Sequence, residues 1–269
     1  MEFNQAFSPP YGLTNPHVQT ILSSVGRKVR VPKPINTFLD ASTEQIIEVA
    51  GVRLVVHCNT QANDPDAPLI MIIPGWLGNS RSSYVVSAAL QLWQQGFNVV
   101  RINLRDHGDT AHLNSGLFHS ALIEEVIELA QHLMTGGRSA PDHRRPCGLI
   151  GYSLGGNFAL RLARAIPELT TLAICPAIDP YATMRQIESS VIYRNYFIIK
   201  WRKLFREKQR HFPTLYDFGP AMKLSSVALL TDYFIKYHSE FDDTESCLLY
   251  TSDAADEGLG VDLGGRRII

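Results

Sequence analysis

The sequence lacks the features that would place the protein in a membrane or on a nucleic acid. No uninterrupted apolar run approaches the roughly 20 residues that a membrane-spanning helix requires. The formal net charge of the 269 residues is only -1, and the pI is about 6.8, whereas proteins that bind by neutralising phosphates carry a positive excess. The start, Met1 to Gln5, lacks the basic and then apolar layout of a signal peptide. We therefore expect a cytoplasmic protein that binds small molecules and no nucleic acid.

Cysteine is scarce, and its spacing excludes two further classes of protein. None of the four cysteines forms a C-x-x-C pair, so we expect reduced thiols, no disulfide framework, no metal site and no cofactor. Apolar residues, by contrast, make up 45% of the chain, which is enough for a sizeable core. The four cysteines are Cys58, Cys147, Cys175 and Cys247.

Strand and helix patterns alternate through the middle of the chain. Residues 1–40 are rich in Pro and Asn and predict an irregular arm that packs on the surface. Residues 41–180 predict an α/β domain with a mostly parallel central sheet flanked by helices. The predicted strands are 45–49, 52–57, 69–73, 97–103, 147–150 and 170–175, the first two forming a hairpin, and the predicted helices are 82–95, 119–135 and 157–163.

Residues 181–246 show helical and aromatic patterns without a convincing strand, which predicts a helical cap over the sheet. The stretch Val191 to Phe205 mixes aromatic, apolar and basic side chains at near-helical spacing. A peripheral membrane contact is one interpretation. A cap helix that roofs a pocket and keeps its lysines and arginines in water is favoured, because the net charge is near zero.

A Gly-x-Ser-x-Gly sequence joins the fifth predicted strand to the following helix. Gly151 and Gly155 flank Ser153 at the spacing of a nucleophile elbow, where a strained turn exposes the serine hydroxyl at the edge of the sheet. The positive end of the following helix then faces the place where an oxyanion would form. We interpret Ser153 as a catalytic nucleophile rather than part of an ordinary glycine-rich turn.

An acyl-transfer serine also needs backbone donors for the oxyanion. In this architecture one amide follows the nucleophile and the other follows the third strand, which predicts the amides of Leu154 and Trp76. Gly75 would let the backbone turn the Trp76 amide inward. The alternative is a plain turn with a tryptophan in the core.

The general base is harder to find. Triads on such an elbow follow the chain order serine, acid, histidine, so His107, which precedes Ser153, breaks the pattern. We interpret the cluster around it as a turn in which Arg105 pairs with the nearby aspartates. His211 and His238 lie in the cap region and follow no strand. Asp179 follows the sixth strand, and it is interpreted either as a triad acid or as an ordinary turn residue.

The last part of the chain resembles non-native sequence. Residues 247–257 and 261–269 resemble in-frame translations of the two constant parts of a transposase-type sequencing-library adapter, and residues 258–260 leave room for an index. We therefore expect 247–269 to be a non-native tail and the native sequence to stop near Ser246. The alternative is a genuine strand that carries Asp253 as a triad acid.

Four segments together resemble the YheT-like, embryogenesis-associated family of α/β hydrolases, and the resemblance covers the chain up to about Ser246. It implies an α/β-hydrolase fold, a Ser-Asp-His triad with Ser153 as the nucleophile, and hydrolysis of short-chain or lipid-like esters. Relatives often carry histidine where this chain has Pro74, and their acid and histidine follow two later strands that we expect to be missing here. We therefore assign neither. The segments are Pro10–Thr20, Pro74–Ser80, Asn103–Gly108 and Gly151–Asn157.

The sequence thus predicts that the intact parent protein is a serine carboxylesterase or lipase-like enzyme that acts on a small ester through an acyl-enzyme at Ser153. Without a base, this chain should be nearly inactive. Acyl transfer to an acceptor other than water, and a non-catalytic binding protein on the same fold, are the alternatives. The sequence does not specify an oligomeric state.

Overall fold

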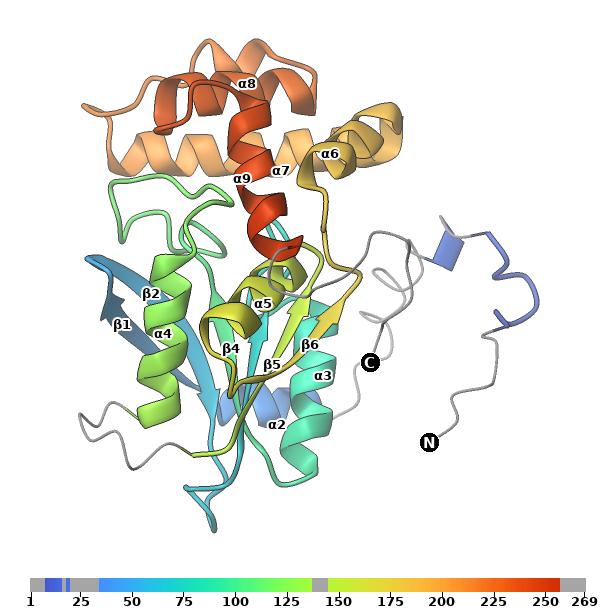
Figure 1. The fold of residues 1–269 in the computed structure, drawn as a ribbon, viewed down its shortest axis with the longest axis vertical. Coiled ribbons are helices and arrows are strands. Elements are labelled where there is room, and N and C mark those ends of the chain that lie inside the picture. Colours follow the sequence, from blue (N-terminus) through green and yellow to red (C-terminus); the bar gives the residue numbers. More distant parts are fainter. Residues whose placement is uncertain (1–7, 16–17, 20–33, 137–144, 257–269) are drawn as a thin grey trace.

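The computed structural model describes residues 8–15, 18–19, 34–136 and 145–256. A six-stranded sheet in the order β1-β2-β4-β3-β5-β6 forms its centre (Figure 1). β1 and β4 both run antiparallel to β2, whereas β4, β3, β5 and β6 are parallel to one another, so the mostly parallel sheet is confirmed. The strands are β1 Thr43–Val49, β2 Val52–Asn59, β3 Leu69–Ile73, β4 Asn98–Asn103, β5 Cys147–Tyr152 and β6 Thr170–Ile174.

The strands form where the sequence pattern predicts them. Ala50 and Gly51 join β1 to β2 with positive φ angles of 48° and 71°, the geometry of a tight hairpin turn. β3 is a continuous apolar run because helices cover both faces of the sheet: Met71 and Ile73 face one layer and Ile72 the other.

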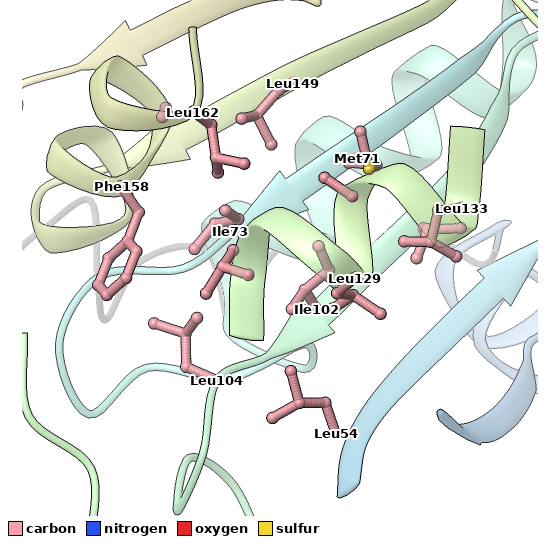
Figure 2. Close-up of a cluster of buried hydrophobic side chains, with 14 of the residues drawn as sticks. Leu54, Met71, Ile73, Ile102, Leu104, Leu129, Leu133, Leu149, Phe158 and Leu162 are labelled. Carbon is pink, nitrogen blue, oxygen red and sulfur yellow. The ribbon is translucent and has the colours of Figure 1, made fainter. Parts of the chain in front are cut away.

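Two layers of helices enclose the sheet (Figure 1). The larger core lies between the sheet and the helices α4 and α5, where Leu129, Leu133, Phe158 and Leu162 pack against strand residues such as Met71 (Figure 2). α2 and α3 cover the other face. The bounds are α2 Pro34–Asp40, α3 Ser83–Gln94, α4 Glu124–Thr135 and α5 Leu154–Ala165.

Two of these helices differ most from the sequence prediction, and α5 is longer at both ends than the predicted 157–163. α2 falls in the segment that we expected to be irregular. Its first residue is Pro34, and proline favours the first turn of a helix although it breaks later turns. α2 is held by Phe38, which is 1% exposed and whose carbonyl accepts a hydrogen bond from the Asn59 side chain (Nδ2) at 2.8 Å. α4 begins at Glu124 rather than at residue 119, and it ends at Gly136 in a left-handed cap, as predicted.

Residues 181–246 contain helices joined by loops and no strand, and these helices lie above the carboxyl ends of the strands (Figure 1). A second apolar core holds the cap together around Trp201, Phe205, Phe218 and Phe234. None of the helices in the described part combines the length and apolarity needed to traverse a bilayer. The cap elements are α6 Pro180–Ser189, α7 Val191–His211, the short 3-10 helix Ala221–Lys223 and α8 Val227–His238.

A buried ion pair joins the cap to the loop that follows β4. The Lys208 side chain of α7 is 0% exposed and donates to Asp106 Oδ1 at 2.7 Å. It also donates to the carbonyl oxygens of Asn114 at 2.7 Å and Gly116 at 2.8 Å. Because the oxygen acceptors of the ammonium all come from this one loop, Lys208 ties α7 to the loop.

Residues 244–256 form the helix α9 (Thr244–Asp256), so the alternative of a C-terminal strand, on which Asp253 was the candidate acid, is wrong about the strand. α9 runs from the cap down to α5 (Figure 1). Cys247 and Thr251 are fully buried, and the Thr251 carbonyl accepts from the Asn157 side chain (Nδ2) at 3.1 Å. The non-native origin of 247–269 stays a prediction, and residues 257–269 lie outside the described residues.

Candidate active site

The turn between β5 and α5 has the strained geometry expected of a nucleophile elbow. Ser153 has φ 53° and ψ -115°, a conformation that costs a non-glycine residue of order 1–3 kcal/mol. A Cβ on Gly151 would lie 2.0 Å from the carbonyl oxygen of Gly155, so a larger residue could not let strand and helix approach this closely. The serine is exposed at the tip of the turn.

The loop after β3 lies directly against this elbow. A Cβ on Gly75 would be 3.2 Å from the Ser153 Cβ, and one on Gly155 would be 2.4 Å from the Pro74 carbonyl oxygen. Within the loop, Gly78 donates to the Gly75 carbonyl at 2.8 Å, and Leu77 has a positive φ of 55°. The loop is therefore a tight turn that sets the backbone beside the serine.

Two backbone amides at this junction have no acceptor among the described residues, those of Trp76 and Leu154. The neighbouring amides are occupied: Gly75 donates to the Tyr84 hydroxyl at 3.0 Å, and Ser153 donates to the Ile174 carbonyl at 3.0 Å. Leu154 begins α5, so its N–H is one of the free donors at the positive end of the helix. The structure thus brings the three predicted site residues together, and their catalytic roles stay predictions.

Ser153, Trp76 and Leu154 line one cavity of about 530 Å³ between the core and the cap. Most of its wall is apolar or aromatic. The Trp76 ring stacks on Phe197 at 4.9 Å between centroids and meets Trp201 edge-on at 5.1 Å, so the indole belongs to the cap wall while the backbone of this residue lies at the elbow. The expected pocket-roofing role of α7 is consistent with this packing.

His107 lies in the core and does not line this cavity. Its Nδ1 lies 2.8 Å from the Arg105 carbonyl oxygen, and burial lowers the pKa of the imidazole to about 4. The expected pairing of Arg105 with nearby aspartates is wrong: Arg105 binds Glu125 at 2.7 Å, while Asp106 binds Lys208. Both partners come from other elements, which local spacing does not reveal.

The other candidate bases and the candidate acid also lie away from the serine. His238 is packed among cap aromatics, 5.2 Å from the Phe218 ring, and burial lowers its pKa. The rings of His211 and His112 lie 5.6 Å apart, and neither residue lines the cavity with Ser153. Asp179 caps α6 by accepting from the Ala182 amide at 2.8 Å, which favours the turn interpretation.

One histidine that the sequence analysis did not single out does line the cavity, His119. Its Nε2 lies 3.2 Å from Glu240 Oε2, and its buried Nδ1 has no partner among the described residues. Burial lowers the pKa of this imidazole, and the Glu240 charge opposes that shift. The sequence pattern places His119 at the start of a predicted helix rather than in a loop at the site. Nothing in the sequence near it indicates its carboxylate partner, Glu240, which lies far later in the chain.

The chain resembles known hydrolases in sequence. A profile described as the alpha/beta hydrolase family matches residues 70–256. A Haemophilus influenzae protein described provisionally as an esterase/lipase is 26% identical over 115 residues, 43% of this chain and 36% of the relative. The mouse sn-1-specific diacylglycerol lipase ABHD11 is 26% identical over 155 residues, 57% of this chain and 46% of the relative. This chain therefore spans less than half the length of either relative.

Solved structures of two esterases match part of this chain. The Pyrococcus furiosus esterase Pf2001 matches with a TM-score of 0.49 and 19% identity, over 65% of each chain. Est1E from Butyrivibrio proteoclasticus matches with a TM-score of 0.42 and 19% identity, over 53% of this chain and 54% of the other.

Proposed function

The chain belongs to the alpha/beta hydrolase family, and from that premise we propose that it is a serine hydrolase that cleaves carboxylic esters through an acyl-enzyme at Ser153. The family accounts for the fold, a mostly parallel sheet flanked by helices. The observation that carries the proposal is the junction at Ser153, where a strained serine lines one cavity with two residues whose amides have no acceptor among the described residues.

Each group at this junction has a chemical role in the proposal. The Ser153 Oγ attacks the ester carbonyl, and the amides of Trp76 and Leu154 donate to the oxyanion that forms. The bond from the carbonyl carbon to the alcohol oxygen then breaks, and the alcohol leaves with the proton that the serine hydroxyl gave up. Water attacks the acyl-serine carbonyl next, which releases the acid and returns a proton to the Ser153 oxygen. Because the two amides are fixed by a turn and a helix start, they need little reorganisation when charge develops on the substrate oxygen.

The described residues do not supply an evident base for the serine. No hydrogen bond in this part of the chain joins a histidine to the Ser153 hydroxyl, and His119 already uses Nε2 for Glu240. A serine without a base is a weak nucleophile, and about 1000- to 10000-fold acceleration over water survives when triad members are removed from known enzymes. We therefore assign no triad acid or base, and propose that Ser153 in this chain reacts slowly.

A fluorophosphonate probe tests the proposal, because it reacts with activated serines. We expect slow labelling that peptide mass spectrometry places on Ser153 and that Ser153→Ala removes. His119→Ala should leave the labelling rate unchanged. An absence of any Ser153 adduct after prolonged incubation would reject the enzyme, and fast labelling that is lost in His119→Ala would identify His119 as the base.

A non-catalytic binding protein is the second candidate, favoured by the absence of a hydrogen-bonded histidine at Ser153 in the described residues and by the apolar cavity. In that case the cavity would bind apolar ligands although Ser153 never forms an adduct. The two readouts, labelling and ligand binding, therefore separate the candidates.

A further inference from the structure

Lys200 is the one permanently charged side chain among the described residues that line the cavity with Ser153. The rest of the lining is apolar, aromatic or uncharged at neutral pH, and this includes His119, whose pKa is lowered by burial. No aspartate or glutamate of the described part lines it. An apolar cavity with a single cation is suited to a ligand that has an apolar body and one negative charge.

The ammonium of Lys200 is not neutralised by a carboxylate in the described residues. It donates to the Leu77 carbonyl at 3.0 Å and lies 4.8 Å from the centre of the Tyr196 ring. An ammonium has three N–H donors, so this carbonyl leaves donors for a ligand. Lys200 is half-buried, and a partly desolvated cation attracts an anion more strongly than one in open water.

The position of Lys200 orients such a ligand. Leu77, its hydrogen-bond partner, directly follows Trp76, so the cation lies beside the turn that holds the proposed oxyanion donor. Tyr196 beside it is 51% exposed, whereas Trp201, Phe234 and Ile235, also in the lining, are all buried. An apolar chain would therefore lie against the buried wall, with its charged group at the more exposed end.

We propose that the cavity binds amphiphiles that carry one phosphate or carboxylate group and that Lys200 binds this group. For cleavage, the inference rests on the proposed function: the preferred substrates would be esters with an anionic group near the scissile bond. For binding alone, Ser153 does not need to react.

Three ligands with one tail test the inference: decyl phosphate, decyl glucoside and decyltrimethylammonium, each below its micelle concentration. Trp76 and Trp201 line the cavity, so ligand binding should change the tryptophan fluorescence. Decyl phosphate should bind about tenfold more tightly than decyl glucoside, as expected for a charge-assisted hydrogen bond at a half-buried site. Decyltrimethylammonium should bind most weakly. Inorganic phosphate alone should leave the fluorescence unchanged.

The variants separate the charge of Lys200 from its other effects. Lys200→Met should abolish the preference for decyl phosphate while decyl glucoside binding stays within about twofold, and Lys200→Arg should keep the preference. Lys203→Met makes the same charge change on the same helix at an exposed position outside the cavity, and it should have no effect.

Equal binding of the phosphate and glucoside ligands to the unchanged protein would overturn the inference, as would a preference that survives Lys200→Met. A response to inorganic phosphate alone would mean a site for a free anion. Fluorophosphonate labelling decides the proposed function separately: a phosphate preference without any Ser153 adduct would leave a binding protein, and an adduct without the preference would leave a hydrolase for neutral esters.

Discussion

Replacing Lys208 with methionine should destabilise the protein severely, because it leaves the Asp106 carboxylate buried without its cation. Both side chains are 0% exposed, and Asp106 would keep the hydrogen bond from the Phe118 amide at 3.0 Å. Removing one partner of a buried ion pair costs about 3–5 kcal/mol. The loss of the bonds from Lys208 to two loop carbonyls acts in the same direction.

Urea unfolding followed by far-ultraviolet circular dichroism measures this loss. Lys203→Met is the matched control, since Lys203 is exposed on the same helix and its replacement should change the free energy of unfolding by less than about 0.5 kcal/mol. The double variant Lys208→Met with Asp106→Asn tests the mechanism. Asparagine tolerates the φ of 60° at position 106, and removing the charge should restore about 1 kcal/mol or more.

A free-energy loss below about 1 kcal/mol in Lys208→Met would refute the reasoning, because it would mean that water reaches Asp106. A double variant that is less stable than Lys208→Met alone would refute it in another way. The carboxylate would then contribute through the Phe118 amide rather than through Lys208.

Two further predictions concern the core and the elbow. His107 binds a proton in the unfolded chain below pH 6.5 but in the folded protein only below about pH 4, so the free energy of unfolding falls as the pH falls through this window. Urea titrations should therefore show that, between pH 7 and 4.5, the free energy of unfolding falls by about 2–3 kcal/mol more in the wild type than in His107→Asn. The same pH dependence of unfolding free energy in both proteins would contradict this. Gly155→Ala would place a Cβ 2.4 Å from the Pro74 carbonyl oxygen, so it should cost about 1–3 kcal/mol and slow Ser153 labelling. If Gly155→Ala has the stability and the labelling rate of the wild type, the loop after β3 can move aside at little cost.

Elements whose patterns are local were predictable from the sequence. The five apolar residues of β3 identify a strand buried on both faces, and the glycines around Ser153 identify the elbow that the structure contains. Backbone conformation and burial depend on neighbours in the sequence, so the six strands and the helical cap could be derived. α2 was missed because Pro34 reads as a breaker unless the position of the helix start is known.

Pairings across the fold could not be derived. Arg105 and Asp106 are adjacent in the chain, but their partners are Glu125 in α4 and Lys208 in the cap. Similarly, nothing near His119 indicates that Glu240 will reach it. Such pairs depend on how distant elements pack together, α4 against the loop after β4 in the first case and the cap against the core in the others, and the order of charges along the chain does not reveal that packing.

The backbone of Ser153 has a consequence for how variants of this protein would be selected. Glycine adopts this conformation with little strain, so a glycine at position 153 would relieve of order 1–3 kcal/mol while removing the hydroxyl. At position 153, thermal stability therefore favours glycine, whereas reactivity requires serine. A library of variants selected only for stability at high temperature would accumulate folded but unreactive sequences, unless each round of selection also requires reactivity at position 153.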